Sequence, residues 1–138
     1  MLLDTHVWIW AAADEPGKLG PKTRRLIARA AAAGSLLVTT ASVFEITALA
    51  TAGRLRLNQS AEKWIRDSVI RGALRVVSVD LDIAIDAGAI PSTALADPVD
   101  RMLVASARAY DVPLVTRDRQ ILEYASRSQL VRVSDAAA

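Results

Sequence analysis

The sequence contains no cysteine, few aromatic residues and no long run of apolar or charged residues. Without cysteine there is no disulfide framework, no thiolate metal site and no cysteine nucleophile, and a cytoplasmic location fits this absence. Aromatic residues make up 4% of the chain, too few for a platform that binds single strands by base stacking. A nucleic-acid partner would therefore be held mainly through its phosphates.

Targeting and membrane-spanning signals are also missing. The first six residues, MLLDTH, include no Lys or Arg, and an acid interrupts them at position 4, so this start does not read as a signal peptide. With 52% apolar and 23% charged residues in short runs, a helical membrane protein and a disordered chain are both excluded. A chain of 138 residues is one domain by length. We expect that domain to span residues 1–133, with a disordered, frayed tail at 134–138.

The acidic residues are unevenly divided between the two acid types. Seventeen Lys and Arg residues against fifteen acids leave a net charge of +2, and eleven of the acids are Asp while four are Glu. Helix interiors tolerate Glu better, whereas Asp favours helix caps, turns and metal-ligand positions. The positions of the aspartates are therefore the first clue to function.

Short apolar strands alternate with helices along the chain. We predict strands at 2–3, 35–40, 75–79, 113–116 and 130–133, and helices at 21–33, 42–52, 60–71, 81–89, 97–110 and 119–125. This alternation is typical of a three-layer α/β/α domain with a mostly parallel central sheet. In such a sheet every strand-to-helix turn lies along one edge, and ligands bind outside that edge.

Five acidic residues lie at or just after these turns. Asp4 ends the first strand, Glu45 lies near the start of the helix after the second strand, and Asp118 follows the fourth strand. Asp97 and Asp100 are three residues apart at the start of the helix at 97–110, and so share one helical face. We expect folding to bring these carboxylates toward one edge of the sheet.

Each acid also has a simpler explanation as a helix cap, and for any single residue that explanation is favoured. Ser42 and Glu45 have the spacing of a capping box, and Asp97 precedes a proline as an N-cap does. Several carboxylates gathered along one edge, however, repel one another unless a cation or a proton compensates them. Oxygen ligands without His or Cys suit Mg²⁺ or Mn²⁺, with one or two ions bound.

The same segments resemble the successive motifs of a known family. Residues 2–8 (LLDTHVW), 42–46 (SVFEI), 97–105 (DPVDRMLVA) and 113–118 (PLVTRD) are similar, in order and spacing, to those of PIN-domain nucleases. The similarity covers essentially the whole chain and is strongest to VapC-type toxins of bacterial toxin–antitoxin pairs. It implies a PIN-like fold, Mg²⁺-dependent cleavage of RNA, inhibition by a cognate antitoxin, and dimerisation.

The resemblance also assigns the site residues. The four catalytic acids of the family fall on Asp4, Glu45, Asp100 and Asp118. We expect Asp4 and Asp100 to bind the metal directly, while Glu45 and Asp118 complete its shell through water or orient the attacking water. Asp97 is left open as a cap, an auxiliary ligand or both. Thr116 matches a hydroxyl position that supports the site.

Arginine dominates the basic residues, since only three of the seventeen are Lys. Phosphate binding would therefore rest on guanidinium groups. Arg101 and Arg117 adjoin acids of the site and are the candidates for contacts with RNA phosphates, although Arg101 could instead pair with Asp97. The lone histidine, His6, is interpreted as structural.

Three other functions fit parts of this pattern. A phospho-receiver domain needs a late lysine, and none follows Lys63. A haloacid-dehalogenase-type phosphatase needs a second aspartate two residues after Asp4, where His6 stands. A non-catalytic dimeric binding module stays open, and metal titration separates it from a nuclease, because acids that only cap helices bind no Mg²⁺ or Mn²⁺.

Overall fold

The computed structural model describes residues 1–138 and contains one sheet of five short strands. The strands are β1 (Leu2–Leu3), β2 (Leu37–Thr39), β3 (Arg75–Val77), β4 (Leu114–Thr116) and β5 (Val133–Asp135). All neighbouring strands are parallel, in the order β3-β2-β1-β4-β5. The predicted α/β class is confirmed, and the sheet is wholly parallel.

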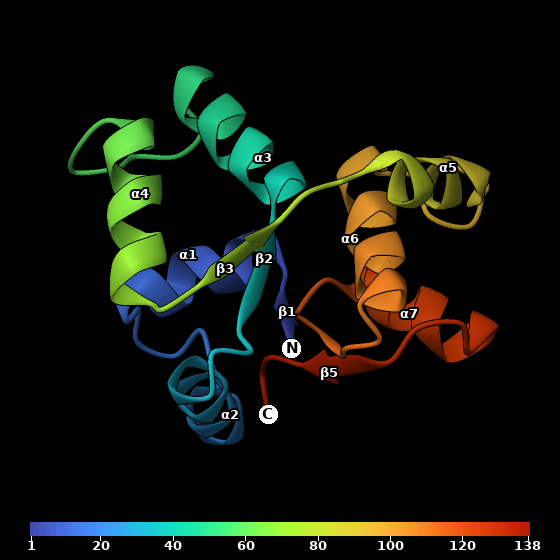
Figure 1. The fold of residues 1–138 in the computed structure, drawn as a ribbon, viewed down its shortest axis with the longest axis horizontal. Coiled ribbons are helices and arrows are strands. Elements are labelled where there is room, and N and C mark those ends of the chain that lie inside the picture. Colours follow the sequence, from blue (N-terminus) through green and yellow to red (C-terminus); the bar gives the residue numbers. More distant parts are fainter.

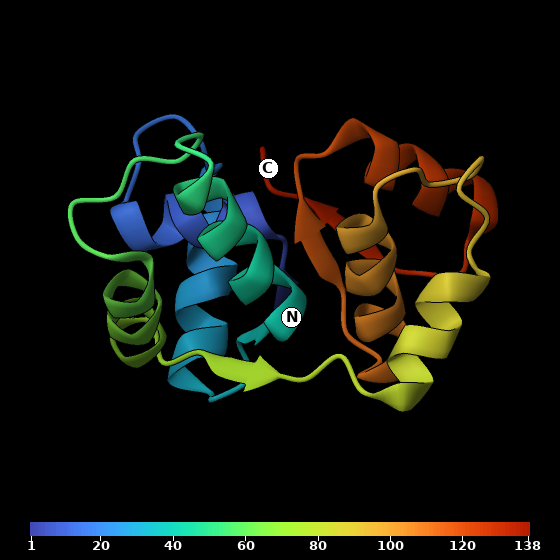
Figure 2. The ribbon, with the colours of Figure 1, turned by 90° about the horizontal axis from the view of Figure 1, so that it is seen from above.

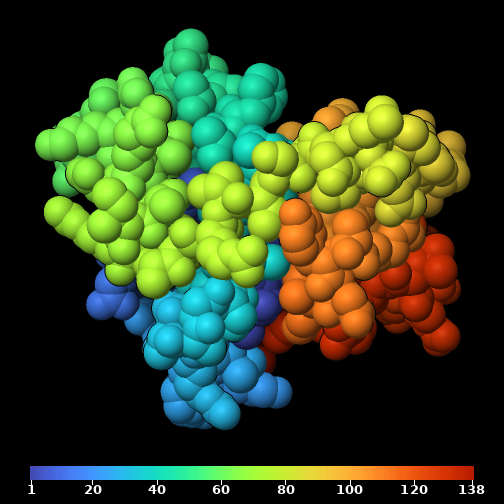
Figure 3. Space-filling model, in the orientation of Figure 1, coloured from blue at the N-terminus to red at the C-terminus, as the bar shows by residue number.

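Seven helices lie around this sheet. They are α1 (Thr5–Ala13), α2 (Pro21–Ala32), α3 (Thr40–Thr51), α4 (Ala61–Arg71), α5 (Leu81–Ala89), α6 (Pro98–Ala109) and α7 (Arg119–Ser128). Figures 1 and 2 show α1 to α4 gathered on one side of the molecule and α5 to α7 on the other. On the face in Figure 3, α3 (teal) and α5 (yellow) project with a notch between them.

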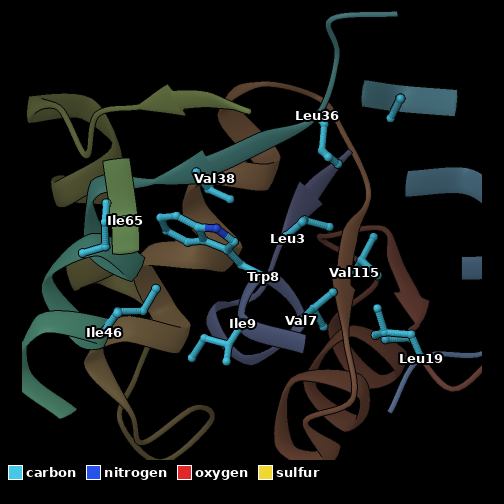
Figure 4. Packing of buried hydrophobic residues seen from close by; sticks show 12 residues of the cluster. Leu3, Val7, Trp8, Ile9, Leu19, Leu36, Val38, Ile46, Ile65 and Val115 are labelled. Atoms are coloured by element: carbon cyan, nitrogen blue, oxygen red, sulfur yellow. The ribbon is translucent and has the colours of Figure 1, made fainter. Parts of the chain in front are cut away.

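The central strands send alternate side chains into two cores, as the twofold repeat of a strand requires. Leu3, Val38 and Val115 belong to the core that contains Trp8, while Leu2, Leu37 and Leu114 belong to the core beneath α6 and α7. Figure 4 shows the Trp8 indole among the side chains of the first core, and its Nε1 donates a hydrogen bond to Ser68 Oγ at 3.1 Å. Burial on both faces makes β1 and its neighbours a rigid support.

The order of the strands places a switch point at β1. The chain builds β2 and β3 outward on one side of β1, then returns to place β4 and β5 on the other side. At such a reversal the connections leave a crevice beyond the carboxyl ends of the strands, where ligands bind. Asp4 follows β1 directly and therefore lies at this point.

The first helix, α1, begins directly after β1, so His6 lies on a helix and not on a continued strand. The sequence pattern does not reveal this helix. Its residues, THVWIWAAA, are apolar on nearly every side, and a helix without a polar face has no amphipathic period.

The C-terminal residues differ most from expectation. The strand expected at 130–133 lies at Val133–Asp135, and the prediction of a disordered tail at 134–138 is wrong. Ala136 is fully buried, its N–H donates to the Thr116 carbonyl at 2.8 Å, and its carbonyl accepts from Gly20 N–H at 2.9 Å. A side chain on Gly20 would clash with the backbone of Ala138. Backbone hydrogen bonds hold this end, and a run of alanines gives no pattern that predicts them.

Candidate active site

Asp4 is the most tightly held acid of the site. It caps α1, where its Oδ1 accepts from Thr5 N–H at 2.6 Å, while its Oδ2 accepts from Thr116 Oγ1 at 2.7 Å. The Thr116 hydroxyl in turn accepts from Asp118 N–H at 2.9 Å. Burial raises the pKa of Asp4 above its usual value, and the hydrogen bonds from Thr116 and Thr5 partly oppose this. The carboxylate is therefore fixed between β1 and β4 in an environment that disfavours its charge.

Glu45 comes to the site from α3, but not as part of a capping box. The N-cap is Thr39, whose hydroxyl accepts from Ser42 N–H at 3.2 Å, so the predicted pairing of Ser42 with Glu45 is wrong. Ser42 Oγ instead shares a hydrogen bond of 2.8 Å with Thr5 Oγ1, which joins α3 to α1. Glu45 lies one turn further along the same face, half-buried. Because it caps nothing, its carboxylate is available to the site.

Asp97 and Asp118 do cap helices, as their positions predict, and each has an oxygen to spare. Asp97 Oδ1 accepts from Val99 N–H at 2.7 Å and from Asp100 N–H at 3.3 Å. Asp118 Oδ1 accepts from the first-turn amides of α7 at 2.8 and 3.2 Å. Both side chains are exposed. Capping and a site role are therefore compatible, because a carboxylate has two oxygens and each can accept more than one bond.

Asp100 lies where the charges of the other acids meet. Burial, and to a smaller extent the negative charges of Asp97, Asp118, Asp4 and Glu45, together raise its pKa to about 8. Every effect on this carboxyl disfavours its charged form, because no donor or cation compensates it. Since α3 contacts α6, acids from four separate segments of the chain act on one another.

None of these five acids has a basic partner. The protein forms five ion pairs, and their acids are Asp14, Glu15, Glu62, Asp86 and Asp111. No three carboxylates of the site converge on one point as a finished metal-binding group, as expected of like charges with nothing between them. An all-oxygen donor set with uncompensated charge at a switch point fits a hard divalent cation, which would draw the carboxylates together.

The two candidate phosphate-binding arginines are placed differently. Arg101 does not pair with Asp97. Its Nη2 makes a long contact of 3.5 Å with the Ala96 carbonyl, and its buried Nε has no hydrogen-bond partner. Arg117 is exposed, donates through Nη1 to the Lys18 carbonyl at 2.8 Å, and lies over the Trp10 ring. Both guanidinium groups thus flank the acids without neutralising them.

Sequence reasoning missed four further residues near the acids. Thr5 and Ser42 are buried and join α1 to α3, and a hydroxyl directly after Asp4 is the one signal that could have pointed to this link. His6 is exposed on α1, and its ring lies tilted against that of Trp10. Their spacing of four residues places them on one face of a helix, which becomes visible only once α1 is known to be helical.

Comparison with known proteins adds to this geometry. The PIN domain family model matches residues 1–127. Ribonuclease VapC22 from Mycobacterium tuberculosis is 33% identical to this chain over 121 residues, which cover 88% of each protein.

Solved structures share the fold at low sequence identity. VapBC2 from Rickettsia felis, bound to a DNA fragment from its promoter, matches with a TM-score of 0.69 and 12% identity over 96% of each chain. DNA-bound VapBC from Salmonella typhimurium matches with a TM-score of 0.65 and 20% identity, covering 97% of this chain and 96% of that one. FitAcB from Neisseria gonorrhoeae matches with a TM-score of 0.63 and 19% identity over 98% and 96% of the two chains.

Proposed function

Because this chain belongs to the PIN-domain family and is a VapC-like ribonuclease toxin, we propose that the acids around Asp4 and Asp100 form an endoribonuclease site that works with Mg²⁺. The pKa of Asp100 carries this proposal, since burial and four neighbouring carboxylates raise it to about 8. A site that negative favours a divalent cation. The family is typically metal-dependent, and Mn²⁺ has the same preference for oxygen ligands.

In this proposal Asp4 and Asp100 would hold the ion directly, and the free oxygens of Asp97 and Asp118 would serve as auxiliary ligands. The bound ion would withdraw charge from the phosphate and acidify a water molecule. Glu45 would orient the water and accept its proton on a carboxylate oxygen as the water oxygen bonds to phosphorus. The bond from phosphorus to the leaving ribose oxygen then breaks, and that oxygen takes up a proton from solvent. Thr116 holds the Asp4 carboxylate in place through its 2.7 Å hydrogen bond, as supporting groups around metal ligands do.

Arg101 and Arg117 bind RNA phosphates in this proposal, because each adjoins an acid of the site without being neutralised by it. Contacts of this kind release counterions, so RNA affinity should fall steeply as salt is added. A flat response to salt would remove the phosphate contacts from the proposal.

The substitution Asp4→Asn tests the site. It should abolish Mg²⁺-dependent cleavage of RNA while circular dichroism and the melting curve show a folded protein. Asp82→Asn on α5, an exposed acid in a first helical turn, is the matched control and should cleave normally. Cleavage by Asp4→Asn at the normal rate would reject the assignment, and absence of any Mg²⁺ or Mn²⁺ binding would favour a non-catalytic binding module.

An antitoxin is the partner we propose, because the structural relatives are toxin–antitoxin complexes. A cavity of about 440 Å³ between α1, α2 and α4, lined by Trp8, Ile27, Trp64 and Leu74 among others, suits an apolar antitoxin segment. An antitoxin arginine would complement the acids. Ala12→Glu at the cavity wall should prevent complex formation, and Ala28→Glu, exposed on α2 outside the cavity, should not. Equal binding by both variants would contradict this placement.

We also propose a homodimer in the cytoplasm, where RNA is available. Exposed apolar side chains lie on the two helices that border the notch in Figure 3: Phe44 on α3 is 69% exposed, and Leu81 and Ile85 on α5 are 75% and 62% exposed. Burial of such residues against a second copy is favourable. Sedimentation should give a dimer for the wild type and a monomer for Ile85→Asp. No helix combines the length and apolar character that crossing a bilayer requires.

A further inference from the structure

Beside the acids, three polar side chains surround one indole ring. The ring centroids of His6 and Trp10 are 5.9 Å apart with an interplanar angle of 46°. Lys18 Nζ lies 5.6 Å from the Trp10 centroid, and Arg117 Cζ lies 5.9 Å from it. Distances near 6 Å are within the range of cation–π attraction. An imidazole and two cations from three segments of the chain are therefore collected on one aromatic residue.

This group borders the acidic site through two of its members. His6 follows Asp4 by two residues on the first turn of α1. Arg117 lies between Thr116, which hydrogen-bonds the Asp4 carboxylate, and Asp118. The group therefore lies next to the acids of two segments, the start of α1 and the turn after β4.

The group is anchored on one side and open on the other. Trp10 is partly buried and packs against the core that contains Trp8. Arg117 Nη1 donates to the Lys18 carbonyl at 2.8 Å, which ties the segment after α1 to the turn after β4. The His6 side chain is exposed. A clamp that only joins these segments would need the bond from Arg117 but not an exposed imidazole held against the indole.

We propose that His6, Trp10, Lys18 and Arg117 form a subsite for an unpaired RNA nucleotide next to the cleaved bond. The base stacks on the exposed His6 ring, which Trp10 contacts and holds in place. The adjoining phosphate lies against Lys18 and Arg117. This proposal rests on the ribonuclease function proposed above and names the form of its substrate, a splayed-out single-stranded nucleotide.

Two physical arguments support this occupant. Unpaired RNA bases stack on aromatic and imidazole rings, whereas bases in a duplex are not free to do so. A phosphodiester backbone is also repelled by five carboxylates, and cations beside the acids offset that repulsion. Overall aromatic content is too low for stacking along the whole strand, but a single stacked base requires only one exposed ring.

Stacking is tested by removing the base and the ring separately. The substrates are a single-stranded RNA oligonucleotide cleaved by the wild type, with the cleaved bond mapped from its ends, and the same oligonucleotide with an abasic nucleotide on one or the other side of that bond. At one of these positions the wild type should lose at least about fivefold in kcat/KM, through KM. His6→Ala should show this loss on the intact RNA and no further loss on the abasic RNA. If His6→Ala and the abasic substitution each reduce kcat/KM, and their combination reduces it by the product of the two factors, the stacking role is overturned.

The phosphate contacts are tested by salt dependence. Arg117→Ala and Lys18→Ala should each raise KM and reduce the slope of log affinity against log salt by about 0.7, the value for one contact with a single strand. Arg25→Ala is the matched control, because Arg25 is exposed on α2 and takes part in none of the five ion pairs. Slopes equal to that of the control would overturn the phosphate role.

Binding in EDTA, followed by fluorescence anisotropy of labelled RNA, separates this proposal from the ribonuclease function. Base-dependent binding that is lost in His6→Ala, together with no cleavage by the wild type in Mg²⁺, would remove the nuclease function and keep the subsite. If the wild type cleaves RNA, and His6→Ala and Arg117→Ala have unchanged RNA binding and KM, the nuclease function is kept and the subsite is rejected. RNA that is neither bound nor cleaved would overturn both.

Discussion

The charged side chains at one end of helix α6 are paired, and those at the other end are not. At its C-terminal end, Arg108 donates from Nε and Nη2 to the two carboxylate oxygens of Asp86 on α5, at 3.1 and 2.6 Å. At its N-terminal end, Asp97 and Asp100 face other carboxylates and have no cation. A forked pair of this geometry is worth up to about 1 kcal/mol at a half-exposed site. Charge is therefore neutralised where α5 and α6 pack together, and is left uncompensated at the end of α6 where we propose a metal site.

The largest expected effect concerns activity and separates the two ends completely. Asp100→Asn should reduce Mg²⁺-dependent RNA cleavage by at least about a hundredfold, because even groups that only support a metal ligand cost 10- to 100-fold when removed. Arg108→Ala should leave kcat within a factor of about two, since it lies at the other end of the helix. Initial rates on one RNA at saturating Mg²⁺ measure both. A fall of similar size in the two variants would show that α6 acts as a unit.

The next effect is on the free energy of unfolding of the metal-free protein. Asp100→Asn and Arg108→Ala should change it in opposite directions. Asp100→Asn removes a carboxylate that its neighbours repel, and should stabilise the metal-free protein by about 1 kcal/mol. Arg108→Ala leaves Asp86 unpaired and should destabilise the protein by up to about 1 kcal/mol. Urea unfolding in EDTA at pH 8 gives both values. A destabilising Asp100→Asn would contradict the view that this end of the helix is strained by like charge.

The third effect is a dependence of stability on pH. The pKa of Asp100 is about 8 in the folded protein, against 3.8 for an unperturbed Asp side chain. Between these two pH values the folded state therefore keeps a proton on Asp100 that the unfolded state has released. The contribution of Asp100 to the stability of the metal-free protein is therefore greatest below about pH 4. This contribution falls as the pH rises toward 8. Melting temperatures in EDTA should show this decline in the wild type and in Arg108→Ala.

Asp100→Asn should flatten the same profile, because it removes the titrating group. Mg²⁺ should stabilise the wild type more at pH 8 than at pH 6, since metal ligands must be deprotonated. An identical decline in Asp100→Asn would assign it to another group.

Much of the site follows from local sequence signals. A short apolar strand that ends in Asp4, and the Asp-Pro pair at Asp97 before an amphipathic helix, predict both elements correctly. The start of α3 could not be predicted to the residue. Thr39 and Ser42 are both good N-caps, and the structure uses Thr39 because β2 ends there. Local propensity cannot choose between two hydroxyl residues three positions apart.

The alternation of strands and helices and the acids at the turns can be predicted from the sequence, since periodicity and capping act within a few residues. Tertiary packing sets the interaction of these acids with one another in place of basic partners, and the meeting of His6 and Arg117 at Trp10. The hydrogen bond between Thr116 and Asp4 joins residues 112 positions apart. Such contacts depend on β1 lying between β2 and β4, an order set by the packing of two cores against one sheet, which no local pattern encodes.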